Sequence, residues 1–229
     1  MPNWVTTVMH VRGTPAQLHE YREFAREQKT PGAPEADSRE LDFGKFIPMP
    51  PGLQISHDSF AEMGAELLLG LPCKALSYPW AAAKGLHTPV QFMDWLLREH
   101  PEQHACAGAM AANRLEHGHF SWYGWAVEHW GTKWNACSVE VFGGTLPSDE
   151  QTHAELVYRF DTAWALPEPV LYAMACHFPA LEFSGTFNEE SRSFHGDFAG
   201  KDGVMRITTR DGAAPGTELE EDEEDGSLD

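Results

Sequence analysis

The chain has 229 residues and a formal net charge of −19 at pH 7, a length that suits one large domain or one domain with a sizeable insertion. Phosphate backbones are repelled by so acidic a chain, which disfavours direct DNA or RNA binding and favours a basic partner. Hydrophobic residues make up 42% of the chain, enough for a core, and the four cysteines form no C-x-x-C pair. We therefore expect reduced thiols and no disulfide framework.

Acidic residues are concentrated at the C-terminal end. Residues 211–229 contain nine Asp or Glu residues and no Lys or Arg, which leaves −10 on the remaining chain. Such a segment cannot bury enough apolar surface to fold, so we predict an acidic disordered tail over 211–229.

The first residues lack a basic region followed by an apolar run, so no signal peptide is expected. No stretch approaches the roughly 20 apolar residues that cross a bilayer. We therefore expect a cytoplasmic protein with no membrane contact.

The N-terminal part predicts a strand, a helix and a second strand. Trp4 to Val11 alternates and is rich in Val and Thr, which is typical of a strand. Thr14 and Gln17 form a capping-box pattern around a proline, which predicts a helix over 15–28. A short strand is expected over 41–47, ended by a Pro-rich run.

The middle of the chain reads as helical. Apolar residues at helical spacing predict helices over 60–69 and 102–116. A second capping-box pattern at Thr88 and Gln91 opens another helix between them. The aromatic-rich stretch 119–130 is expected to be a helix or a turn packed on the core.

The C-terminal part again alternates strands with one helix. Strands are expected over 135–142, 154–161 and 181–187, with a helix that begins at Pro167 before the third strand. Two further short strands flank the turn 200–203, which is typical of a hairpin.

Two split strand–helix–strand units are the ferredoxin-like plan. We therefore predict an α+β fold: a ferredoxin-like split β-α-β sandwich with an α-helical insertion and a C-terminal β-hairpin. The predicted parts are 1–52 as the first β-α-β half, 53–128 as the helical insertion, 129–210 as the second half with the hairpin, and 211–229 as the acidic tail.

Several separated blocks resemble the Api92-like (YubB) proteins of phages and plasmids. The blocks are Met1–Val5, Asp42–Pro50, Trp130–Asn135, and Thr162–Trp164 with Pro167. The resemblance implies a ferredoxin-like domain and a gene carried by a mobile element in a bacterial host. It implies no catalytic residue.

The twelve histidines raise the question of a metal site. The candidates are His100, His104, His117, His119 and His129. Zinc needs three or four converging ligands, and neither an H-E-x-x-H motif nor paired C-x-x-C motifs occur. The favoured interpretation is surface and capping histidines, with no cofactor.

Nucleophilic catalysis has no local signature. The sequence contains no G-x-S-x-G motif, and its glycines fit turns better than a phosphate-binding loop. An isolated cysteine is more often a small buried residue than a nucleophile.

The candidate ligand- or partner-binding residues lie in two Trp-containing turns. They are Trp130, Thr132, Lys133, Trp134, Asn135, Asp161, Thr162 and Trp164. In the favoured interpretation the tryptophans anchor strand ends and the polar side chains satisfy turn backbone groups. In the other interpretation, the aromatic rings with nearby Lys133 and Asn135 hold a partner or a flat ligand.

From these features we expect a non-catalytic accessory protein that binds a host protein with a basic surface. In its sharpest version the acidic surface imitates nucleic acid and serves counter-defence. The alternative is a small-ligand or metal-dependent enzyme with a site between the sheet and the helical insertion, near His129, Trp130 and Asp161.

Overall fold

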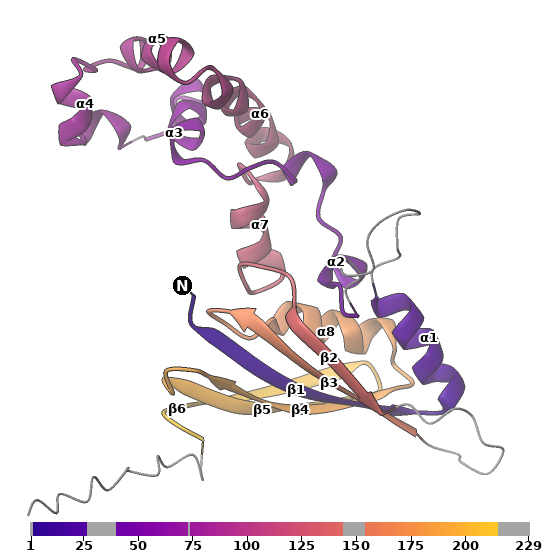
Figure 1. The fold of residues 1–229 in the computed structure, drawn as a ribbon. Coiled ribbons are helices and arrows are strands. Elements are labelled where there is room, and N and C mark those ends of the chain that lie inside the picture. The colour runs from indigo at the N-terminus through magenta and orange to yellow at the C-terminus, as the bar shows by residue number, and fades with distance from the viewer. Residues whose placement is uncertain (1, 27–39, 73, 144–153, 215–229) are drawn as a thin grey trace, which may run out of the picture. The chain divides into compact units, whose positions relative to one another are not determined.

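The computed structural model describes residues 2–26, 40–72, 74–143 and 154–214. The chain forms two compact units (Figure 1). Unit 1 comprises residues 1–41 and 136–229, and unit 2 comprises residues 42–135. Most of the predicted acidic tail lies outside the described residues.

Unit 1 is a six-stranded antiparallel sheet in the order β2-β3-β1-β4-β5-β6, with helices α1 and α8 on one face (Figure 1). Its elements are β1 (Trp4–Gly13), α1 (Pro15–Ala25), β2 (Cys137–Gly143), β3 (Ala154–Ala163), α8 (Glu168–His177), β4 (Glu182–Glu189), β5 (Phe194–Lys201) and β6 (Val204–Asp211). The first four strands have the ferredoxin-like order. The predicted fold class is therefore confirmed, including the C-terminal hairpin.

Strand β1 runs through the middle of this sheet, between β3 and β4. Its residues alternate between a buried and a partly exposed face, and Val5, Met9 and Val11 are fully buried. Met9 lies opposite Tyr158 of β3, which is also fully buried. The period-2 pattern that predicted the strand thus reflects one face packed under the helices.

The layer between the sheet and the helices is aromatic. Tyr21 of α1 is fully buried, and its ring meets Tyr158 at 5.8 Å and Phe178 at 5.2 Å between centroids, edge to face. Its hydroxyl donates to the Met174 sulfur at 3.7 Å. Edge-to-face pairs of this kind add about 0.5–1.5 kcal/mol each beyond the area they bury.

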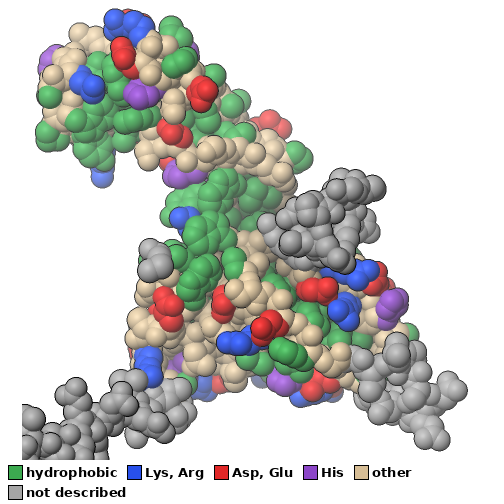
Figure 2. Space-filling model, in the orientation of Figure 1, with side chains coloured by type: hydrophobic (Ala, Val, Ile, Leu, Met, Phe, Trp, Pro, Cys, Tyr) green, Lys and Arg blue, Asp and Glu red, His purple; other side chains and the backbone are tan. Residues whose placement is uncertain are grey.

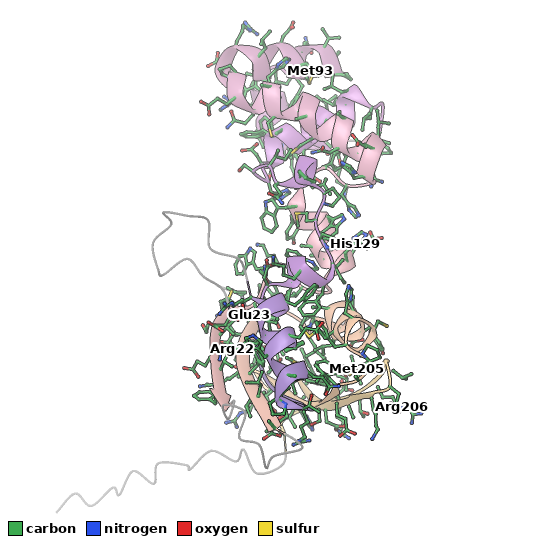
Figure 3. All side chains as sticks on the ribbon, turned by 90° about the vertical axis from the view of Figure 1, so that its right-hand side faces the viewer. Arg22, Glu23, Met93, His129, Met205 and Arg206 are labelled. Carbon is green, nitrogen blue, oxygen red and sulfur yellow. The ribbon has the colours of Figure 1, made fainter. Side chains whose placement is uncertain are left out.

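The hairpin of β5 and β6 turns on two residues, because Lys201 pairs with Val204. Asp202 has φ 52° and Gly203 has φ 78°, the positive values that a type I′ turn requires. Side chains of β6 then alternate: Met205 is buried, whereas Arg206 is exposed and points outward (Figure 3).

The strand predicted over 41–47 is wrong, because Phe43–Phe46 forms the short helix α2. Phe43 and Phe46 are both buried and are three residues apart, a spacing that places them on one side of a helix. The side chain of Asp42 accepts from Gly44 N at 2.9 Å and begins the helix. The first half of the ferredoxin-like domain therefore lacks a strand here, and β2 after the helical unit takes that place.

Unit 2 is helical in its described residues. Its elements are α2, the 3-10 turns η2 (Pro51–Leu53) and η3 (Ala75–Ser77), α3 (Ser59–Leu68), α4 (Pro79–Ala83), α5 (Pro89–Glu99), α6 (Pro101–His117) and α7 (Trp122–His129). A Cβ on Gly64 of α3 would lie 2.9 Å from the Cβ of Ala107. Glycine is therefore present because α3 and α6 pack closely at this point.

Both predicted capping boxes are present. The side chains of Thr14 and Thr88 accept from the backbone of Gln17 and Gln91, and each glutamine bonds back to its threonine. Helix α6 ends at Gly118 in the left-handed conformation, as glycine after a helix favours. Among the described residues, no helix has both the length and the apolar character to span a membrane.

Candidate functional site

The turn Trp130–Asn135 directly follows α7 within unit 2. Trp130 is 8% exposed, and its Nε1 donates to the Ile47 carbonyl at 2.9 Å. Its ring meets Trp125 edge to face at 5.6 Å. A buried indole with its N–H satisfied is an anchor for the turn.

Asn135 joins this turn to α2. Its side-chain oxygen accepts from Phe43 N at 2.9 Å, and its amide nitrogen donates to Asp42 Oδ1 at 2.7 Å. Thr132 of the same turn is 2% exposed. These two polar side chains thus lie in the packing of unit 2, and Asn135 positions the residue that caps α2.

The ammonium group of Lys133 lies beside two aromatic rings. Its Nζ lies 5.2 Å from the Tyr123 ring centroid and 4.8 Å from that of Trp134. Tyr123 is 37% exposed, and Val127 in the same helix is 47% exposed. Hydrophobic side chains gather over α7 in Figure 2. This is the part of the turn region that a partner could reach.

The corner Asp161–Trp164 lies in unit 1. Asp161 accepts from Thr6 Oγ1 at 2.7 Å, and the buried Thr162 donates to the Ala165 carbonyl at 2.7 Å. Trp164 has φ 73° and is 52% exposed, and its backbone N–H donates to the Asn3 carbonyl at 2.9 Å. The two candidate turns thus belong to different units.

The candidate histidines separate into different surroundings. The ring of His100 packs against Trp95 at 4.7 Å and Phe60 at 5.3 Å between centroids. His104 lies in the first turn of α6, where its N–H donates to the His100 carbonyl. His117 Nε2 lies 3.8 Å from Glu116 Oε1.

His119 and His129 come together, and Glu128 joins them. Ligand atoms from these three side chains all lie within 4.8 Å of one another. His119 Nε2 is 3.3 Å from Glu128 Oε2, and the two imidazole centroids are 5.5 Å apart. Both histidines were predicted candidates from the sequence, whereas Glu128 was not. The adjacent Glu128 and His129 were a sequence signal for a metal site. His119 precedes α7 in the chain, and its distance in sequence from this pair fits no known ligand spacing.

The surroundings of Cys106 do not activate its thiol. Cys106 Sγ lies 3.9 Å from the Ser56 carbonyl, and burial, followed by the charge of Asp58, raises the pKa of its thiol. Cys176 Sγ lies 3.7 Å from the Gly203 carbonyl. A raised thiol pKa works against nucleophilic chemistry at neutral pH.

The sheet face opposite α1 and α8 carries mixed charge. Glu155 lies 2.6 Å from Arg12 and 3.1 Å from His10, and Glu182 lies 2.5 Å from Lys201. Two shallow hollows on unit 1 share Arg12 and Glu182 in their linings. Because acids and bases pair across neighbouring strands, these contacts build no single-sign patch of the kind that recognises nucleic acid.

The strand order and the two helices of unit 1 define an α+β protein with a ferredoxin-like domain. Residues 145–226 match the family model described as the ferredoxin-like domain in Api92-like protein. The match confirms the predicted resemblance to Api92-like proteins over this range. The matched range begins after β2, whereas the sheet also includes β1 and β2.

Among solved structures, the comparison finds the crystal structure of a protein Api92 from Yersinia pseudotuberculosis. It has 10% sequence identity and a TM-score of 0.44, and the alignment covers 94% of this chain and 100% of that chain. No curated protein sequence matches the chain.

Proposed function

We propose that the protein is a non-catalytic binding protein that occupies a basic groove on a host protein and competes there with nucleic acid. The single observation that carries this proposal is the charge distribution. Of the net −19, nine negative charges fall within residues 211–229, where no Lys or Arg occurs. A dense run of carboxylates offers a basic groove the same kind of charge as a phosphate backbone.

The folded residues of unit 1 support the same division of charge. Arg12, Arg159, Lys201 and Arg210 each lie against a carboxylate of a neighbouring strand. Each of these four basic side chains is thus neutralised within the sheet. Residues 211–229 hold nine acidic residues and no Lys or Arg, and the chain joins this segment to the sheet through β6.

The setting implied by the Api92-like resemblance favours a host target. A protein encoded by a phage or plasmid gains from blocking a host nucleic-acid-binding protein, and counter-defence is the corresponding role. Acting on such a target requires no catalytic group in the described residues, because occupying the groove is sufficient.

The test is competition for a basic DNA-binding protein of a bacterial host. A fluorescent duplex is bound to each member of a panel of such proteins, and the untagged full chain is added. We expect displacement of the duplex from at least one of them. Displacement should weaken steeply between about 50 and 300 mM salt, because the contacts are screened charges.

The decisive variant changes Glu218, Glu220, Glu221, Glu223 and Glu224 to Gln. We expect it to displace the duplex at least about tenfold less well at low salt. The control changes the same number of paired body carboxylates, namely Glu23, Glu140, Glu155, Glu182 and Asp197, to their amides and should displace almost as well as the native chain. Displacement that ignores both salt and the tail variant, or no displacement across the panel, would refute the proposal.

A metal-dependent function is the second candidate. The specific observation that favours it is the convergence of His119, Glu128 and His129, which lies within unit 2 alone.

A further inference from the structure

Two histidines and one carboxylate meet at the C-terminal end of α7. Glu128 and His129 are the last two residues of this helix, and Figure 3 shows His129 there. His119 lies in the short connection that follows α6, where Gly118 takes φ 79°. The chain reversal after α6 thus brings His119 beside the far end of the next helix.

His129 is held in one orientation. Its Nδ1 lies 3.1 Å from the Trp125 carbonyl, and its ring stacks on the Trp125 ring at 4.4 Å with 5° between the planes. A carbonyl oxygen only accepts, so Nδ1 carries the proton and Nε2 of the neutral ring carries the lone pair. Metal-binding histidines show this pattern, with the second ring nitrogen donating to a backbone carbonyl.

His119 is also suited to bind a metal. Only 13% of its side chain is exposed. Its Nε2 faces Glu128 within the cluster, and the neutral imidazole is the form that binds a metal.

The spacing agrees with a tetrahedral site. Ligand bonds of about 2.0–2.2 Å place two ligand atoms of a tetrahedron roughly 3.3–3.6 Å apart. The His119 Nε2 to Glu128 Oε2 distance is already 3.3 Å. The largest separation in the cluster is within 4.8 Å, and the Glu128 side chain, 70% exposed, can rotate to close it.

We propose that His119, Glu128 and His129 bind one divalent transition-metal ion of the zinc class, with the fourth coordination position open to solvent. Two imidazoles select against Ca²⁺ and Mg²⁺, which take oxygen ligands. Two histidines and one glutamate with an open position are a donor set that zinc accepts. The site is independent of the acidic segment and of the binding role proposed above.

The competing explanation is a simple one. Glu128 would form an ion pair with His119, and His129 would only bond to the backbone of its own helix. Stoichiometric metal binding that depends on Glu128 and His129 separates the two explanations, because an ion pair needs no metal.

The experiment titrates the untagged, metal-free full chain with Co²⁺ and follows visible absorption, and Zn²⁺ then competes for the same site. We expect one tight equivalent with the intense absorption of a four- or five-coordinate site, displaced by Zn²⁺. Glu128→Gln should weaken binding by more than about tenfold, and its exposed position spares the fold. His129→Phe, which keeps a ring on Trp125, should do the same.

His104→Ala is the matched control, because this histidine lies outside the cluster, and it should bind like the native chain. Thermal unfolding confirms that each variant is folded, and added Zn²⁺ should raise the unfolding temperature of the native chain but not of Glu128→Gln. The proposal fails if the native chain binds no single tight equivalent, or if Glu128→Gln and His129→Phe both bind as the native chain does.

Discussion

At the residue scale, the carboxylate of Glu189 organises the turn between β4 and β5. Its Oε2 accepts from Ser191 Oγ at 2.6 Å, from Ser193 Oγ at 2.8 Å and from Ser193 N at 3.1 Å. The bond from Ser191 is the main cause that lowers the pKa of Glu189 to about 2; burial opposes it, and the bonds from Ser193 lower it further. The ionised form is therefore the one that this turn binds.

This lowered pKa predicts a pH-dependent effect of Glu189→Gln. The native carboxylate stabilises the fold above its unfolded pKa, near 4.5, and that contribution is lost as pH falls through the folded value of about 2. Glu189→Gln should therefore lower the unfolding temperature at pH 7, and the difference from the native chain should narrow as pH falls from about 4.5 toward 2.

Glu190→Gln serves as the control, because Glu190 is exposed and adjacent; its unfolding temperature should follow that of the native chain at every pH. If the unfolding temperature of Glu189→Gln stays below that of the native chain by the same amount down to pH 2, the hydrogen-bonded carboxylate does not stabilise the turn in this way.

Single polar residues also show what a sequence can and cannot reveal. Turn roles for Asn135 and Thr162 were predictable, because these residue types commonly satisfy turn backbone groups. The partners were not, since Asn135 bonds to residues 92 and 93 positions away. Glu128 was missed for the same reason, because only the reversal between α6 and α7 brings it beside His119.

At the element scale, the spacing of apolar residues and the capping motifs predicted most helices and strands. The prediction failed over 41–47, where Leu41 and Phe43 alternate as in a strand. A four-residue helix has too few positions for a helical period to be visible. Its N-cap, Asp42, is held by Asn135, a contact that local sequence does not contain.

Glycine and phenylalanine face each other across β4 and β5. Gly185 pairs with Phe198, and Phe187 pairs with Gly196. A Cβ on Gly185 would lie 2.5 Å from Phe198 Cζ and would also collide with the Val8 carbonyl of β1. The ring occupies the space above the glycine, which fixes the register of these strands.

Gly185→Ala should therefore destabilise unit 1 by about 1–3 kcal/mol, because a backbone carbonyl and a packed ring must both move. Urea unfolding followed by circular dichroism measures it. Gly108→Ala is the control: no atom lies within 4 Å of the added Cβ in α6, so it should stabilise by roughly 0.5–1 kcal/mol. Equal effects of the two substitutions would contradict the packing described for Gly185.

At the scale of the whole molecule, the ferredoxin-like domain is built from both ends of the chain. Strand β1 and helix α1 precede the helical unit, and β2 to β6 with α8 follow it. Val5, Met9 and Val11 lie in the same sheet as the segments after Trp134. The alternation of β1 predicted a strand, but only pairing across more than a hundred residues places it at the centre.

All six strands of this sheet come from unit 1, so the sheet is complete without residues 42–135. The most direct test removes them, joining Leu41 to Ala136 through a short Gly/Ser linker, and measures urea unfolding by circular dichroism and tryptophan fluorescence. We predict that the shortened chain unfolds in one cooperative transition, at the same urea concentration by both signals. Tyr21→Ala in the shortened chain should abolish this transition, because it removes about 3–5 kcal/mol of core packing. A shortened chain that is unfolded, or that unfolds without cooperativity, would contradict the claim.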